Sequence, residues 1–173
     1  MQFTLLQRPP YLARRQGSAL VPQVLETLRQ AAEGRSRPLR PVPHDARLVI
    51  YVGHDTNLAN IGGMLGVDWT FKSGLEDRTP PAGAMAFELV RETATGTRFV
   101  RMTYFNQTLE QMRKATRLSP PAPRDPSGAN LPDVTTISPR CPNVREGMCP
   151  WAEFVSWMEG ALERKCASLH PQP

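Results

Sequence analysis

Residues 48–60 read LVIYVGHDTNLAN, and this stretch decides the fold class. Its first part, Leu48 to Val52, is a continuous apolar run of mostly β-branched and aromatic side chains. The run is too short for a helix and is typical of a strand buried on both faces. From Thr56 to Leu65 the apolar residues recur at helical spacing. A strand, a tight turn and a helix in this order predict an α/β protein, in which ligands bind at the carboxyl ends of strands.

The sequence before this stretch predicts helices and a linker. Residues 1–20 are amphipathic, but two adjacent prolines interrupt them and allow at best two short helical pieces. A better helix is predicted over Leu20 to Ala32, where apolar residues recur at helical spacing. Residues 35–45 hold three prolines and indicate a loop. We therefore expect a helical segment and Pro-rich linker over residues 1–45, leading into an α/β domain over residues 46–173.

The sequence after this stretch predicts two kinds of element. Alternating apolar residues indicate strands, and apolar residues three or four apart indicate helices. The expected elements are a hairpin of two strands (Met85 to Val90 and Phe99 to Phe105), a short helix (Gln107 to Ala115), a strand (Val134 to Ile137) inside a Pro-rich loop (Leu118 to Arg140), and a closing amphipathic helix (Trp151 to Lys165).

Composition narrows the class of partner. The chain has 173 residues and a formal net charge of +5, which can favour an anionic partner. The basic residues are scattered and form no nucleic-acid-binding motif, so a nucleic-acid partner is not expected. No run of 18 apolar residues exists, so no membrane span is expected. Residues 1–8 lack the pattern of a secretory signal, which taken alone favours the cytosol.

The three cysteines favour an oxidising compartment instead. Cys141 and Cys149 bracket a short polar loop, a natural place for a local disulfide. The alternative is a metal-binding pair, although neither a second cysteine pair nor a nearby histidine accompanies it. Cys166 is then left over, and an odd cysteine beside a disulfide suggests a partner outside this chain.

Reactive side chains concentrate at His54 and Asp55, in the turn between the predicted strand and helix. The amide groups of a helix amino terminus favour an anionic ligand there. A histidine could hold a phosphate oxygen, and a neighbouring carboxyl could protonate a leaving alkoxide and later deprotonate water. The alternative is purely structural, because Asp55 or Thr56 could simply cap the helix.

The octet Gly53 to Asn60 resembles the second signature of the histidine acid phosphatases, in the form found in bacterial periplasmic phytases. Further segments follow in the order of that family, so that the resemblance covers nearly the whole chain. They are Phe3 to Arg8, Asp68 to Thr70, Thr79 to Gly83, Gln107 to Arg113 and Gly147 to Cys149.

The resemblance implies an α/β fold of the histidine-phosphatase (phosphoglycerate-mutase-like) type, a three-layer sandwich that here lacks its amino-terminal nucleophile strand. It implies hydrolysis of phosphate monoesters such as phytate or sugar phosphates through a phosphohistidine, without a metal or other cofactor. Asp55 would be the proton donor, His54 would bind the transferring phosphate, and Thr56 would line the pocket. The resemblance also implies a Cys141–Cys149 disulfide, an upstream partner for Cys166, and a periplasmic location for the full-length protein.

One departure from the family is large. Its nucleophile lies in an amino-terminal Arg-His-Gly-x-Arg-x-Pro motif, and neither His44 nor His170 has those surroundings. We therefore expect the carboxyl-terminal part of such an enzyme, inactive alone and completed by the missing amino-terminal part. Leu48 to Val52 would then expose an apolar edge that the nucleophile strand covers in the family. The alternative function is a non-catalytic module that binds phosphate or inositol phosphates through His54 and the helix amides.

Overall fold

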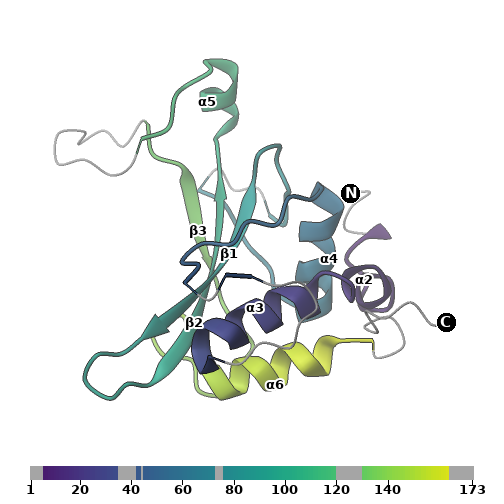
Figure 1. Cartoon of the computed structure of the whole chain (residues 1–173). Coiled ribbons are helices and arrows are strands. Elements are labelled where there is room, and N and C mark those ends of the chain that lie inside the picture. The colour runs from purple at the N-terminus through teal and green to yellow at the C-terminus, as the bar shows by residue number, and fades with distance from the viewer. Residues whose placement is uncertain (1–5, 35–41, 44, 73–75, 120–129, 164–173) are drawn as a thin grey trace.

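The computed structural model describes residues 6–34, 42–43, 45–72, 76–119 and 130–163 (Figure 1). Both helices and strands occur along them, in agreement with the predicted α/β class. The helices are α2 (Pro10–Gly17), α3 (Val21–Glu33), α4 (Asp55–Leu65), α5 (Leu109–Arg113) and α6 (Trp151–Ala161), and the strands are β1 (Ala84–Arg91), β2 (Arg98–Asn106), β3 (Asp133–Ile137) and β4 (Met148–Pro150).

The strands form one antiparallel sheet around β2. Strand β1 pairs with nearly the whole of β2, from Ala84 opposite Phe105 to Arg91 opposite Arg98. The other edge of β2 is shared, since β3 pairs with its second half and β4 with its first. The predicted hairpin is thus confirmed, and Gly96 adopts a positive φ of 74° in its turn. Strand β4 was not predicted, because three residues are too few to show an alternating pattern.

Helices α3, α4 and α6 pack with the sheet around a single core, and α3 and α6 run side by side (Figure 1). From β2, Val100, Met102 and Tyr104 are fully buried, and from α6 so are Phe154 and Met158. Predicted and observed helices agree because the apolar stripes of α3 and α6 are the surfaces that this core buries. No helix among the described residues is long and apolar enough to cross a lipid bilayer.

The predicted strand Leu48 to Val52 is the main correction. These residues form no strand, and Leu48, Ile50 and Val52 are 77%, 73% and 94% exposed. Tyr51 links this segment to α3, because its hydroxyl forms a hydrogen bond with the Thr27 hydroxyl at 2.7 Å. The prediction of a strand buried on both faces was wrong because burial of that kind needs neighbouring strands, and the described residues supply none beside this segment.

Helix α4 lies directly against Arg8, and Gly62 and Gly63 of this helix permit the close approach. A Cβ atom on Gly63 would stand 2.3 Å from the carbonyl oxygen of Arg8, which is backbone and does not move aside easily. The Arg8 guanidinium is held in place by Asp68, at 2.6 Å, and by the carbonyl oxygen of Val67, at 2.8 Å. The close contact fixes the position of α4, and therefore of the turn that begins it.

We expect Gly63→Ala to lower the free energy of unfolding by about 1–3 kcal/mol, the usual cost of overpacking a core. The matched control is Gly160→Ala in α6, where nothing lies within 4 Å of the added Cβ. There the change should raise stability by roughly 0.5–1 kcal/mol, because alanine is the better helix former. Urea unfolding of both variants tests this. If Gly63→Ala and Gly160→Ala changed the free energy of unfolding equally, the close contact between Gly63 and Arg8 would be contradicted.

Candidate functional site

The turn before α4 is shaped by its own short-range hydrogen bonds. His54 is the N-cap residue, with an extended backbone (φ −110°, ψ 167°), and Asp55 is the first helical residue. The side-chain oxygen of Asn57 accepts the His54 N–H at 2.8 Å, and the Asn57 N–H donates to the His54 carbonyl oxygen at 3.0 Å. Gly53 fits here because a Cβ atom would come within 2.7 Å of that Asn57 oxygen.

The three predicted site residues therefore occupy the exposed amino terminus of α4. The His54 and Asp55 side chains are exposed and Thr56 is half-buried. One carboxylate oxygen of Asp55 accepts the Thr56 N–H at 2.7 Å, which holds the carboxylate close to the helix amides. Neither Asp55 nor Thr56 is the N-cap residue, since His54 takes that position and Asn57 supplies the capping side chain.

This arrangement has the elements needed to bind an anion and move a proton. The amino-terminal amide groups of α4 carry a partial positive charge, which favours an anionic ligand beside them. An exposed imidazole and an exposed carboxyl stand next to them on consecutive residues. A carboxyl so placed can give a proton to a leaving oxygen and take one from water.

Tyr104 interacts electrostatically with Asp55 and was not predicted as part of the site. The side chain is fully buried on β2, stacked on Trp69 with ring centroids 5.1 Å apart and edge-on to Phe71 at 5.2 Å. Burial raises the pKa of its hydroxyl well above the usual value, and the negative charge of Asp55 raises it further. The phenol therefore stays protonated at any ordinary pH.

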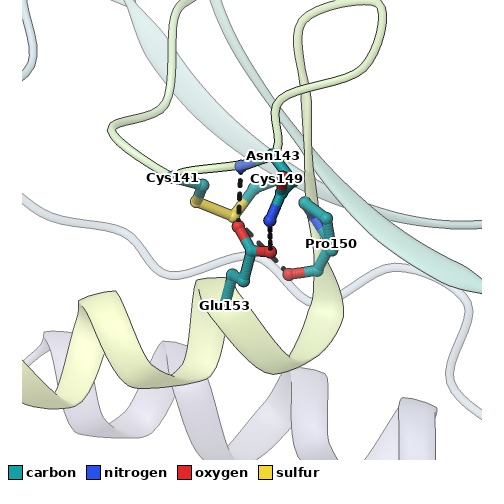
Figure 2. Close-up of a disulfide and its surroundings, with 5 residues drawn as sticks. All are labelled: Cys141, Asn143, Cys149, Pro150 and Glu153. Atoms are coloured by element: carbon teal, nitrogen blue, oxygen red, sulfur yellow. Dashed lines mark hydrogen bonds between the residues drawn. A yellow bond between two sulfur atoms is a disulfide. The ribbon is translucent and has the colours of Figure 1, made fainter.

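The cysteine site lies away from this turn, at the start of α6 (Figure 2). Cys141 and Cys149 are joined by a disulfide, with their Cα atoms 5.8 Å apart. Among the described residues, the Glu153 carboxylate is the one further metal-ligand group close to both sulfurs. It accepts the backbone N–H of Asn143 at 3.0 Å and the side-chain amide of Asn143 at 2.6 Å. Because the two sulfurs are bonded to each other, the alternative of a metal-binding pair is wrong for this structure. Cys166 lies outside the described residues.

A shallow, open hollow occurs at the hairpin end of the sheet. It contains none of the predicted site residues. Arg145 lies over the Phe99 ring there, 5.3 Å from its centroid, and pairs with Glu92 at 3.3 Å. The residues that line the hollow are Val90, Glu92, Phe99, Arg145, Glu146 and Met148.

Comparisons with known proteins agree on one family. Residues 2–105 match the histidine phosphatase superfamily (branch 2). The chain is 33% identical over 171 residues to phytase AppA of Escherichia coli (strain K12), and 28% identical over 119 residues to the glucose-1-phosphatase of Providencia rettgeri. Its fold is similar to that of the Hafnia alvei phytase in complex with myo-inositol hexakis sulphate, with a TM-score of 0.81 and 31% identity.

The matches cover most of this chain but a minor part of the relatives. The alignment with the Escherichia coli phytase takes in 96% of this chain and 36% of that protein, and the alignment with the Providencia phosphatase 69% and 27%. The structural match to the Hafnia phytase covers 95% of this chain and 39% of that one. The chain thus spans a little over a third of the length of these two phytases.

Proposed function

Since the chain belongs to the histidine phosphatase superfamily, branch 2, we propose that it is the carboxyl-terminal part of an enzyme that hydrolyses phosphate monoesters such as phytate or sugar phosphates. In this proposal Asp55 is the proton donor, and His54 and Thr56 bind the phosphate. The observation that carries it is the pairing of exposed His54 and Asp55 at the amino terminus of α4. The reaction runs through a phosphohistidine, with the accepting histidine in the part of the enzyme that this chain does not contain.

The proposed roles follow from the charges that each step creates. As the ester bond breaks, negative charge grows on the leaving oxygen, and the Asp55 carboxyl gives it a proton. The resulting carboxylate then takes a proton from the water that hydrolyses the phosphohistidine. His54 and the amides of the first turn of α4 offset the charge of the transferring phosphate, which they contact from one side.

The exposed strip Leu48, Ile50 and Val52 supports the view that the site is completed from outside this chain. Its three side chains are on average about four-fifths exposed, and the strip leads directly into Gly53 and His54. An apolar edge of this kind pairs readily with another strand. We propose that the strand carrying the nucleophile covers the strip in the whole protein and so brings the phosphate acceptor beside Asp55. A disulfide in the chain supports a periplasmic location.

The direct test is a hybrid enzyme in which this chain replaces the matching carboxyl-terminal segment of the Hafnia alvei phytase. We expect the hybrid to hydrolyse p-nitrophenyl phosphate at acidic pH and the chain alone to show no turnover. A second hybrid has Leu48, Ile50 and Val52 all replaced by Thr. It should lose activity if the nucleophile strand covers these three side chains in the whole protein. Turnover by the chain alone, at a rate near that of the hybrid, would contradict the proposal.

The second candidate is a module that binds phosphate or inositol phosphates without catalysis. The exposure of His54 and of the α4 amino terminus in the chain by itself favours it. Calorimetric titration of the chain with phytate distinguishes the two. Tight binding by the chain, combined with an inactive hybrid, would favour this candidate over the enzyme.

A further inference from the structure

Asn57 binds both backbone groups of His54. It is the third residue of α4, and its side-chain oxygen accepts the His54 N–H at 2.8 Å. The backbone N–H of Asn57 donates to the His54 carbonyl oxygen at 3.0 Å. The His54 N–H and carbonyl belong to the two peptide planes that flank its Cα atom, and φ and ψ are the rotations of these planes. One residue therefore fixes both backbone angles of His54, at φ −110° and ψ 167°.

Gly53 gives the Asn57 side chain the space for this contact. A Cβ atom at position 53 would stand 2.7 Å from the Asn57 side-chain oxygen and 3.3 Å from its Cγ atom. The Asn57 amide could avoid such a Cβ only by moving, and its oxygen would then lose the His54 N–H. The φ of Gly53 is not positive, so a left-handed backbone does not explain the glycine. Gly53 and Asn57 therefore act as a pair.

This contact differs from an ordinary helix cap. In the usual cap, the side chain of the N-cap residue binds an amide of the first turn. Here the N-cap residue is His54, and the Asn57 N–H goes to its carbonyl oxygen, so the imidazole makes no capping bond. The exposed imidazole of His54 therefore remains available to a ligand while its backbone is held. The exposed Asp55 follows directly on the fixed peptide.

We propose that Asn57 is a positioning residue, whose side chain fixes the backbone from which the His54 imidazole and the Asp55 carboxyl project. This inference rests on the proposed function, because it concerns the placement of the groups that bind phosphate and donate the proton. Asn57 acts through His54 and contacts no substrate. A small misplacement of catalytic groups can cost a large factor in rate, so a turn held at both backbone groups of its N-cap residue supports catalysis.

The test compares two substrates of the hybrid enzyme, because the ratio of their rates does not depend on how much of a variant is folded. Hydrolysis of phenyl phosphate depends on a proton donor, and hydrolysis of 2,4-dinitrophenyl phosphate does not. We expect Asn57→Ala to lower the ratio of the two kcat/KM values about tenfold, since a misplaced Asp55 carboxyl slows mainly the substrate that needs its proton. Gly53→Ala should lower the ratio to a similar extent, although it replaces no side chain of the site.

The double variant tests the contact itself. Once Asn57 is replaced by Ala, the oxygen that a Cβ at position 53 would strike is absent, so Gly53→Ala should change the ratio by less than about twofold further. The matched control is Gly160→Ala in α6, where nothing lies within 4 Å of the added Cβ and the ratio should not change. A ratio that Asn57→Ala leaves unchanged would overturn the proposal, and so would effects of the two changes that multiply in the double variant.

If the unchanged hybrid is inactive, the proposed function fails, and the inference is tested in the chain instead. The readout is then hydrogen exchange of the His54 N–H, whose acceptor among the described residues is the Asn57 side-chain oxygen. We expect Asn57→Ala to speed this exchange about tenfold and to leave that of the Met64 N–H, in the last turn of α4, within about twofold. Equal exchange of the His54 N–H with and without the change would contradict the inference.

Discussion

Replacing Asp55 with Asn is expected to lower the kcat of the hybrid enzyme by about 10²–10⁴, the range that general acid–base catalysis contributes. The amide has the size of the carboxyl and can still accept the Thr56 N–H, so the start of α4 should keep its geometry. What it loses is the transferable proton. We expect KM for p-nitrophenyl phosphate to change far less than kcat, since binding relies on His54 and the helix amides.

The matched control for this prediction is Glu110→Gln. Glu110 is an exposed carboxylate on α5 whose partner is Lys114, 2.6 Å away, and no described contact links it to the α4 turn. Glu110→Gln removes one negative charge by an isosteric change, as Asp55→Asn does. The kcat of the Glu110→Gln hybrid should stay within about twofold of the unchanged hybrid, as for most surface substitutions. A loss of similar size in both variants would show that overall charge, and not the Asp55 proton, matters.

Removal of the disulfide is expected to cost the most stability. Cys141→Ser combined with Cys149→Ser should lower the free energy of unfolding by about 2.5 kcal/mol, the loop-entropy value for so short a closed loop. Burial adds to the loss, because the Cys149 side chain is fully enclosed and a serine hydroxyl would need a partner there. Urea unfolding under oxidising conditions measures the difference.

A second variant separates the disulfide from the hydrogen bonds beside it. Glu153→Gln keeps the Cys141–Cys149 bond and weakens the two hydrogen bonds from Asn143 (Figure 2). Its cost should be about 1 kcal/mol or less, because a neutral oxygen still accepts. If the double serine variant unfolds at the same urea concentration as the unchanged chain, the disulfide contributes nothing to the fold.

The elements that could be predicted from the sequence are those whose patterns are satisfied within the chain. Helix α3 buries its own apolar stripe, and β1 finds its partner β2 across a short turn, so local periodicity was sufficient for both. Leu48 to Val52 has an equally clear pattern, but no described residue covers the apolar side chains of Leu48, Ile50 and Val52. Periodicity indicates what a segment can bury and does not reveal whether its neighbour is present.

The candidate site also contains residues that a local motif could predict and residues that only the fold brings together. His54, Asp55 and Thr56 are consecutive, so a motif was enough to identify them. Tyr104 comes from β2, and its contacts with Trp69 and Phe71 join segments far apart in the sequence, which no local motif reveals. The motif that ends in Gly83 was visible in the sequence, but its contact with the Tyr104 hydroxyl is a product of the fold. Asn143 and Glu153 were missed for the same reason.

The most direct test of the central claim compares two substrates of the hybrid enzyme with Asp55 or Asn at position 55. Phenyl phosphate needs a proton on its leaving oxygen, whereas 2,4-dinitrophenyl phosphate releases a stable anion without one. If Asp55 is the proton donor, Asp55→Asn should lower kcat/KM for phenyl phosphate by about 10²–10⁴ and leave 2,4-dinitrophenyl phosphate within about tenfold of the unchanged hybrid. An equal loss for both substrates would contradict the account, because it would mean that Asp55 supports the site without donating the proton.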